Sequence, residues 1–281
     1  MSNRRTRVVT AVIMAPVAVL SVLYLPSEFF AALVAALLML GLWEWTLLAG
    51  LHGRVARASY LVGNAALMAF LVWGAGRDFV ILKLVGLLGA VWWLLVLLWL
   101  LRFNFAANDN RWSRALKLFA GTISVIPAWA SICWLHVQGG GDARASGPVW
   151  ALFALLIVWM ADSGAYFVGV RFGKHKLAPR ISPGKSWEGF FGGLLATVLL
   201  AVVALSFLGL RWASLPDLLL LTVVTALFSV AGDLFESLLK RHAGAKDSSH
   251  LIPGHGGVLD RVDSLLAALP VFVVGKEWLG L

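Results

Sequence analysis

Charged residues are scarce in this chain of 281 residues, where Asp, Glu, Lys and Arg together make up only 13%. A soluble domain carries about 25% charged and roughly 45–50% apolar residues, whereas this chain is 60% hydrophobic and has a mean hydropathy of +0.88. So few charges cannot cover a water-facing surface of this size, which excludes a soluble globular protein and a disordered one. Cysteine is almost absent as well. Because Cys133 stands alone, it forms no internal disulfide.

Nine long apolar runs fill most of the chain. A bilayer core about 30 Å thick requires roughly 20 apolar residues in a helix. The first run is long for the apolar region of a signal peptide, and further runs follow it, so we interpret it as an uncleaved anchor. The predicted fold class is an all-α, polytopic integral membrane protein with about nine transmembrane helices. We expect these spans over residues 8–25, 29–49, 60–75, 79–101, 119–137, 149–170, 189–210, 215–231 and 265–281.

The basic residues are distributed unevenly between the two sides that these spans define. Eighteen Lys and Arg residues lie in the N-terminal segment and in the loops on the same side, whereas four lie in the other loops. The positive-inside rule therefore predicts a cytoplasmic N-terminus and an external C-terminus. In a soluble protein the net charge of +9 would suggest nucleic acid as a partner. In a membrane protein it indicates orientation and contact with anionic lipid, so we expect the lipid bilayer and no nucleic acid.

The composition changes after about residue 148, where the cytoplasmic loops become long and rich in Gly, His, Asp and Lys. We therefore predict a membrane scaffold over 1–148 and catalytic spans with cytoplasmic loops over 149–281. Three polar residues within spans of the first part are assigned no role. Glu44 lies between two tryptophans and is expected at the interface, Lys83 can extend to the membrane surface, and His136 lies at a span end. We expect the tryptophans at the interfaces or facing lipid, among them Trp43, Trp45, Trp92, Trp93, Trp99 and Trp212.

Polar residues recur at helical spacing where the last long loop begins. Asp233, Glu236, Ser237, Lys240 and Arg241 occupy positions i, i+3, i+4, i+7 and i+8, which share one face of a helix. A carboxylate at the end of an apolar span is costly unless it has a partner. Ordinary pairing of Glu236 with Lys240 is one explanation, and a functional site is the other.

A second acidic pair follows a turn-rich stretch that contains His255, Gly256 and Gly257. Asp260 and Asp263 lie three residues apart, at the mouth of the last span. Backbone N–H groups of a glycine loop next to a helix start form an anion-binding concavity. Two carboxylate pairs beside such a loop suggest Mg²⁺ holding a polyphosphate. Zinc is not expected, because His255 has no second His or Cys at ligand spacing.

A third group of polar residues lies one loop earlier. Asp162 falls within a span, where an acidic residue is a functional candidate by default, although a hydrogen bond to a neighbouring helix would also explain it. Ser182 and Lys185 precede a helix start, a favourable place for phosphate. A capping serine and a positive-inside lysine are the alternative interpretations. The stretch 183–186 reads Pro-Gly-Lys-Ser, but Arg180 occupies the position of the first P-loop glycine and no buried strand is predicted before it.

The run from Ser237 to Asp263 resembles the signature of the phosphatidate cytidylyltransferase (CDP-diacylglycerol synthase) family, with its Ser-Leu-Leu-Lys-Arg start and its Pro-Gly-His-Gly-Gly-Val-Leu-Asp-Arg-Val-Asp end. The motifs around 162–166 and 182–189 are also similar to recurrent motifs of that family. The resemblance implies that CTP and phosphatidate react to CDP-diacylglycerol and diphosphate. It also implies Mg²⁺, a second cation such as K⁺, a homodimer, and a site that faces the cytoplasm from the inner membrane.

The resemblance implies roles for individual residues by motif position. Asp233 and Asp260 would be metal ligands, and Glu236 and Asp263 would complete or support the metal site. Phosphate oxygens would lie in the cradle of residues 255–257. Lys240, with Asp233, Asp260 and Asp263, belongs to the expected catalytic set. The expected substrate contacts are Asp162, Ser182, Lys185, Ser237, Arg241, Lys246, His255, Gly256, Gly257 and Arg261.

Two other functions are consistent with parts of the pattern. A transporter would also place carboxylates within spans, but it would have polar groups near the midplane of several spans and inverted repeats. Here the polar residues gather at the cytoplasmic ends of the last few spans. A different lipid acceptor is the second alternative, as in polyprenol-type kinases or archaeal lipid cytidylyltransferases.

Overall fold

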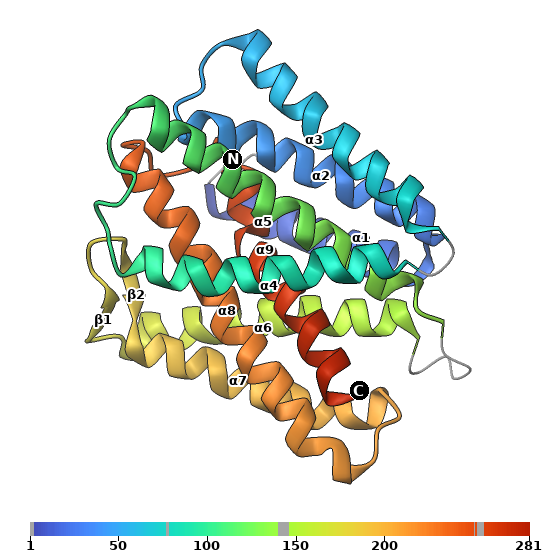
Figure 1. Ribbon diagram of the computed structural model, residues 1–281. Helices are drawn as coiled ribbons and strands as arrows, with labels where there is room; N and C mark the ends of the chain where they lie inside the picture. The colour runs from blue at the N-terminus through green and yellow to red at the C-terminus, as the bar shows by residue number, and fades with distance from the viewer. Residues whose placement is uncertain (1–2, 77–78, 140–145, 250, 252–255) are drawn as a thin grey trace.

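The computed structural model describes residues 3–76, 79–139, 146–249, 251 and 256–281. Within these ranges the chain forms nine α-helices, one 3-10 helix and one antiparallel hairpin (Figure 1). The helices of the first half are α1 (Asn3–Tyr24), α2 (Ser27–Leu48), α3 (Arg54–Ala75), α4 (Val80–Leu100) and α5 (Arg111–Val137). The second half contains α6 (Gly147–Phe172), β1 (Lys176–Ala178), β2 (Ser182–Ser186), α7 (Trp187–Phe207), η2 (Trp212–Ser214), α8 (Leu215–His242) and α9 (Leu259–Leu279).

Each predicted span coincides with one of these helices. Of the helices that the structure describes, seven, α2 to α8, are long and apolar enough to cross a membrane. The chain is therefore a polytopic, mainly α-helical membrane protein, and the number of nine crossings stays a prediction. The structure agrees with the expected all-α class apart from one short hairpin at residues 176–186, where β1 and β2 pair antiparallel with Lys176 opposite Ser186.

Side chains and proline positions define where several helices begin. Asn110 caps α5 by accepting a hydrogen bond from Ser113 N, and Ser186 caps α7 by accepting one from Gly189 N. Proline occupies the first turn of α6 and of α8, where its missing N–H costs nothing. α9 has neither feature in its own sequence, because its N-cap residue is Val258, which has no side-chain oxygen.

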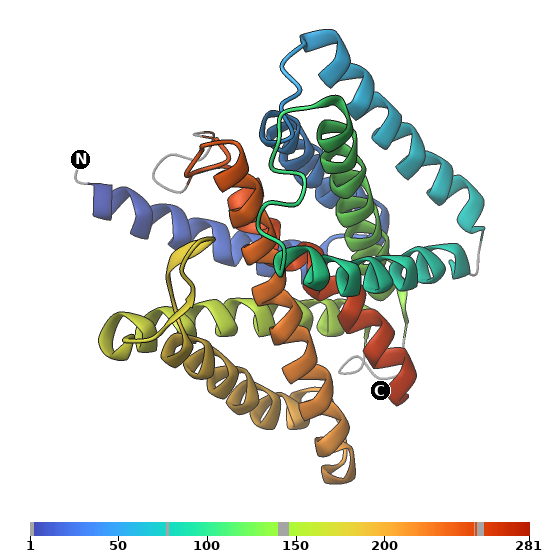
Figure 2. The same cartoon turned by 60° about the vertical axis from the view of Figure 1, so that its left-hand side comes forward.

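Helices from both halves of the chain meet at α9. Gly89 of α4 permits the close approach, because a Cβ there would lie 2.3 Å from Pro127 Cβ of α5 and 3.1 Å from Pro270 Cβ of α9. Figure 2 shows α6 and α7 side by side on one side of the molecule, with α8 and α9 passing between them and α3 and α4. The division into a scaffold and a catalytic part stays a prediction.

Four tryptophans surround Phe235 in the core. Trp45, Trp92, Trp93 and Trp99 have ring centroids 5.2–6.5 Å from that of Phe235, and all five side chains are buried. The expectation that these four tryptophans lie at interfaces or face lipid is therefore wrong. Their rings fill the space where α2, α4 and α8 converge, and such aromatic contacts add to the stability gained from burial. Trp212, in contrast, is exposed at the start of η2.

The loops that the charge pattern assigns to one side lie together at one end of the helices. The α4–α5 connection contacts the hairpin and the end of α8: Arg180 lies over the ring of Phe103, and His242 Nε2 lies 2.6 Å from Phe103 O. Arg241 Nε donates to Ile181 O at 3.0 Å. These contacts agree with alternation of the loops between two sides, and the cytoplasmic position of this end stays a prediction.

Candidate functional site

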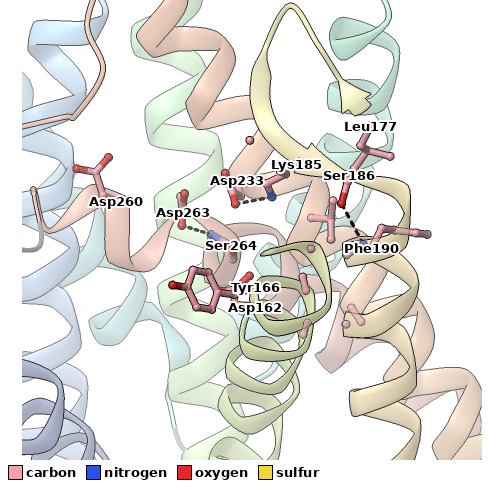
Figure 3. A pocket seen from close by; sticks show the side chains of 18 of the residues that line it. Asp162, Tyr166, Leu177, Lys185, Ser186, Phe190, Asp233, Asp260, Asp263 and Ser264 are labelled. Carbon is pink, nitrogen blue, oxygen red and sulfur yellow. Dashed lines mark hydrogen bonds and ion pairs between the residues drawn. The ribbon is translucent and has the colours of Figure 1, made fainter. Parts of the chain in front are cut away.

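A cavity of about 460 Å³ lies where α6, the hairpin, α7, α8 and α9 meet (Figure 3). One part of its wall is apolar and includes Phe190 and Leu194 of α7 and Val230 of α8. The other part is charged, and it brings together seven of the residues that the sequence predicts for the site. They are Asp162, Lys185, Asp233, Lys240, Asp260, Arg261 and Asp263.

Asp233 is held by the hairpin and by its own helix. Lys185 of β2 lies with Nζ 2.5 Å from Asp233 Oδ2, and Ser237, one turn along α8, donates to Asp233 Oδ1 at 3.3 Å. The hairpin sets the position of Lys185, because the next residue, Ser186, pairs with Lys176 and also caps α7. The lysine that precedes a helix start in the sequence therefore reaches a carboxylate on a different helix.

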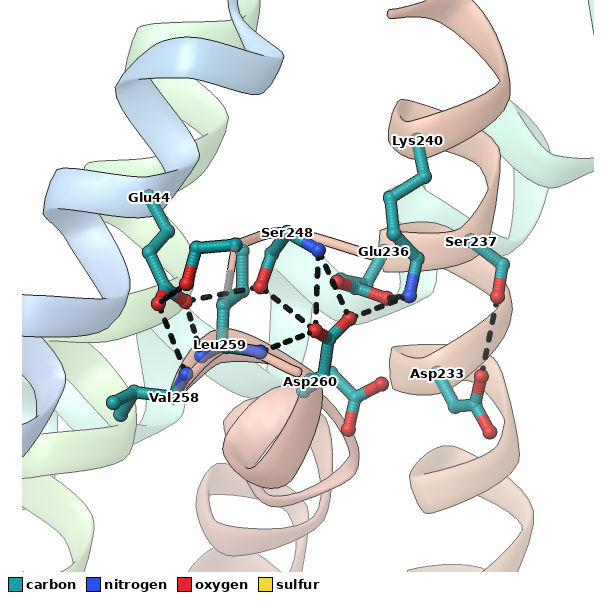
Figure 4. A network of polar contacts seen from close by, with 12 residues as sticks. Glu44, Asp233, Glu236, Ser237, Lys240, Ser248, Val258, Leu259 and Asp260 are labelled. Atoms are coloured by element: carbon teal, nitrogen blue, oxygen red, sulfur yellow. Dashed lines mark hydrogen bonds and ion pairs between the residues drawn. The ribbon is translucent and has the colours of Figure 1, made fainter. Parts of the chain in front are cut away.

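Asp260, in the first turn of α9, accepts hydrogen bonds at both carboxylate oxygens (Figure 4). Its Oδ1 accepts from Lys240 Nζ at 2.8 Å, and its Oδ2 accepts from Gly257 N at 2.8 Å and from Ser248 N at 3.1 Å. Lys240 also forms an ion pair with Glu236, one turn earlier on α8. The predicted i,i+4 pairing of Glu236 with Lys240 is thus present, and it belongs to a larger network that contains Asp260.

Two further carboxylates line the same cavity. Asp263 is buried and accepts from Ser264 N at 2.7 Å, and Asp162 faces the cavity from α6. Gly232 allows α8 and α9 to approach closely at this level, because a Cβ there would lie 2.5 Å from Asp263 O. Within the described ranges, neither Asp162 nor Asp263 has an ion-pair partner, so this side of the cavity holds two carboxyl groups without a basic partner.

The remaining predicted residues lie around the cavity or outside the described residues. Ser182 is on β2, Lys246 is exposed after α8, and Arg241 donates to the hairpin backbone. Gly256 has a φ of +82°, and Gly257 donates to Asp260. His255 lies outside the described residues. Among the residues that the structure describes, the cavity lining does not include Ser182, Glu236, Ser237, Arg241, Lys246, Gly256 or Gly257.

Sequence reasoning missed two residues beside the site, Glu44 and Ser248. The expectation that Glu44 lies at the membrane interface is wrong, since its side chain is completely buried and accepts hydrogen bonds from the segment that leads into α9. The signal was an acidic residue inside an apolar run, and the neighbouring tryptophans led to the interfacial interpretation. Lys83 pairs with Glu277 of α9, and His136 is buried against Val22 O, so both have structural contacts.

The donor set is chemically suited to a hard cation. Carboxylate oxygens are the ligands that Mg²⁺ prefers, and Mg²⁺ usually takes one or two of them together with water and substrate phosphates. In the described part of the chain, no group of three or more His, Cys, Asp and Glu side chains encloses a metal position by itself. The carboxyl groups of Asp162 and Asp263, which have no ion-pair partner within the described residues, fit a cation that arrives with a phosphate-bearing substrate.

Comparison with known proteins covers nearly the whole chain. Residues 5–277 match the model of the cytidylyltransferase family. Phosphatidate cytidylyltransferases from Pseudomonas aeruginosa and Haemophilus influenzae are each 40% identical to the chain, over 273 and 285 residues, and the matches cover 95% of this chain and 95% and 96% of the relatives. The phosphatidate cytidylyltransferase of Staphylococcus epidermidis is 50% identical over 130 residues, which is 46% of this chain and 50% of the relative.

Proposed function

Because the chain belongs to the cytidylyltransferase family, and two relatives that match over nearly their whole length are phosphatidate cytidylyltransferases, we propose that it transfers the cytidylyl group of CTP to phosphatidate. An oxygen of the lipid phosphate forms a bond to the α-phosphorus of CTP. The bond from that phosphorus to the oxygen shared with the β-phosphate breaks, and diphosphate leaves. The products are CDP-diacylglycerol and diphosphate.

The observation that carries this proposal is the mixed wall of the cavity. Lys185, Lys240 and Arg261 provide positive charge for phosphate groups, while Phe190 and Leu194 provide an apolar surface on a membrane helix. A lipid can therefore keep its acyl chains among apolar side chains while its phosphate lies beside the nucleotide. Phosphoryl transfer depends mainly on such positioning and on neutralisation of charge.

The basic side chains of the site would bind the phosphate groups of the substrates. Lys185 and Lys240 are each paired with an aspartate before substrate arrives, so their ammonium groups are already held at the cavity wall. Charge-assisted hydrogen bonds from such groups to phosphate are stronger than neutral ones. We assign Lys185, Lys240 and Arg261 to the triphosphate and the lipid phosphate, with Ser182, Ser237, Arg241 and Lys246 around them.

The carboxylates are the proposed metal-binding groups. Asp233 and Asp260 would hold Mg²⁺, and Asp263 and Glu236 would support it, with a second cation such as K⁺ nearby. Bound Mg²⁺ would polarise the α-phosphate and neutralise charge on the diphosphate that leaves. Asp162 faces the same space from α6 and would add negative charge on the cation side of the substrates.

The loops that carry these residues are proposed to face the cytoplasm, where CTP is available, from the inner membrane of the cell. The excess of basic residues in them supports this orientation. A homodimer, which the family resemblance implies, would appear as twice the chain mass of 30.3 kDa once bound detergent is subtracted.

The test is transfer of label from CTP to lipid by the purified protein in detergent or vesicles. With Mg²⁺ and phosphatidate, we expect radiolabel from cytosine-labelled CTP in the lipid phase and an equal amount of diphosphate. A polyprenol or polyprenyl phosphate in place of phosphatidate should give no labelled lipid. Label on the polyprenyl lipid alone would assign the chain to the other acceptor, and the absence of any labelled lipid would refute the proposed reaction.

A further inference from the structure

Glu44 of α2 is a completely buried carboxylate that four donors satisfy. Its Oε1 accepts from Ser249 Oγ at 2.5 Å and from Val258 N at 3.0 Å. Its Oε2 accepts from Ser248 Oγ at 3.0 Å and from Leu259 N at 2.7 Å. All four donors lie more than 200 residues away along the chain, in the segment between α8 and α9 and at the beginning of α9.

Glu44 serves as the cap that α9 lacks. The first N–H groups of a helix have no partner within the helix, and they form its positive end. Val258, the N-cap residue of α9, has no side-chain acceptor, and its N–H and that of Leu259 both point to Glu44. A carboxylate from another helix therefore completes the start of α9, where its negative charge is favourable.

Ser248 connects this cap to Asp260 (Figure 4). Its hydroxyl oxygen lies 3.0 Å from Glu44 Oε2 and 3.0 Å from Asp260 Oδ2, and its backbone N–H donates to Asp260 at 3.1 Å. A hydroxyl has one proton and serves one carboxylate at a time. Glu44 thus holds both neighbours of Asp260 in place: Ser248, which contacts the Asp260 carboxylate, and the backbone of Val258 and Leu259, which directly precedes Asp260 in the chain.

We propose that Glu44 is a positioning residue, which holds Ser248 and the first turn of α9 so that the Asp260 carboxylate stays directed into the cavity. Within the described residues, Glu44 is not part of the cavity lining, so it acts through Ser248 and the helix start. The inference rests on the proposed function for the role of Asp260, but the anchoring of the segment can be measured without any reaction. Groups that orient a metal ligand typically affect metal affinity or activity by about 10- to 100-fold.

Glu44→Gln is the sharpest single change, because it keeps the shape and removes one acceptor oxygen. Each oxygen of Glu44 faces one backbone N–H, so the amide NH₂ of glutamine must oppose Val258 N or Leu259 N in either orientation. We expect kcat to fall about 10- to 100-fold, with a higher Mg²⁺ concentration at half-maximal rate and little change in the KM for CTP. A merely structural residue would lower the amount of folded protein and leave the Mg²⁺ dependence of the folded fraction unchanged.

Two neighbouring serines provide a matched pair. Ser248→Ala removes a hydroxyl that contacts both Glu44 and Asp260, whereas Ser249→Ala removes one that contacts Glu44 and not Asp260. We expect Ser248→Ala to shift the Mg²⁺ dependence in the direction of Glu44→Gln, and Ser249→Ala to shift it much less. Equal effects of the two serine variants would contradict the proposed route to Asp260. This pair also keeps the proposal testable if Glu44→Gln does not fold.

Glu277→Gln is the control for loss of an interhelical contact of α9, because Glu277 pairs with Lys83 of α4 and lies at the opposite end of α9 from Asp260. It should leave the Mg²⁺ dependence unchanged.

Hydrogen exchange followed by mass spectrometry separates this proposal from the proposed function. In Glu44→Gln, peptides covering residues 246–262 should exchange faster than in the wild type, whereas in Glu277→Gln they should not. If the wild-type protein makes no CDP-lipid, the proposed function fails, and the exchange data still report the anchoring. Unchanged exchange in Glu44→Gln would overturn the anchoring. If Glu44→Gln exchanges faster but keeps the wild-type kcat and Mg²⁺ dependence, Glu44 caps α9 without positioning Asp260, and the proposed role is refuted.

Discussion

Lys185 of the hairpin and Asp233 of α8 form an ion pair across the cavity wall, with 2.5 Å between Nζ and Oδ2. Lys240 and Asp260 form a second pair, with 2.8 Å between Nζ and Oδ1. Each of the two carboxylates that are proposed to hold Mg²⁺ therefore has its own lysine. A metal cation that binds Asp233 and Asp260 would replace the two lysines as the partner of these carboxylates. The ammonium groups of Lys185 and Lys240 would then be available to the phosphates of the substrates.

Asp260→Asn and Asp233→Asn should each lower Mg²⁺-dependent release of diphosphate from CTP and phosphatidate by about 100-fold or more, because each removes a charge that stabilises the transition state. The amount of protein in the membrane should stay near that of the wild type. Asp217→Asn is the matched control, since Asp217 lies in the first turn of α8, at the opposite end of the helix from the site. Retained turnover in Asp260→Asn would contradict the site assignment.

Lys185→Gln should lower kcat/KM for CTP about 10- to 100-fold, which is the range expected when a hydrogen bond to a charged group is lost. The change removes a cation from the cavity wall and leaves Asp233 without its ion pair. Steady-state kinetics at varied CTP concentration would measure this fall in kcat/KM. Lys176→Gln, on the other strand of the same hairpin, changes an exposed lysine and should have little effect. Similar losses in both variants would indicate a general role of the hairpin charge.

Gly257→Ala should lower both stability and activity. A Cβ at this position would overlap Ser248 Oγ and lie 2.5 Å from Glu44 Oε2, so the network around Asp260 would have to move. Overpacking of this kind costs about 1–3 kcal/mol. Thermal unfolding in detergent should show a lower midpoint. Gly63→Ala adds the same methyl to α3 where no atom lies within 4 Å of the added Cβ, and its midpoint should not fall.

The orientation of the loops can be measured with introduced cysteines, because the native Cys133 is buried. Lys174→Cys lies between α6 and the hairpin, and Arg211→Cys lies between α7 and α8. A membrane-impermeant thiol reagent should label Lys174→Cys in inverted membrane vesicles and Arg211→Cys in intact spheroplasts. The reverse pattern would show that the site faces the outside, where CTP is absent.

Local patterns predicted the α-helices that the structure describes and some of the contacts around the cavity. An apolar run of about 20 residues forms a helix in a bilayer whatever its neighbours are, so all nine runs correspond to helices. Spacing along α8 placed Asp233 with Ser237 and Glu236 with Lys240, because residues four apart are neighbours on a helix. The β1–β2 hairpin was not predicted, since its three- and five-residue strands contain charge, glycine and proline and have no alternating apolar pattern.

The sequence by itself determined a polytopic membrane protein and the identity of the charged residues near Asp260. Only the tertiary structure decided where Glu44 and Phe235 belong. Glu44 is buried because its donors are the free N–H groups at the start of α9 and two serine hydroxyls, which no local spacing connects to α2. The tryptophans around Phe235 are core because three helices converge on them. A carboxylate or an indole in an apolar run has the same local pattern at an interface and in a core, and the partner that satisfies it comes from elsewhere in the fold.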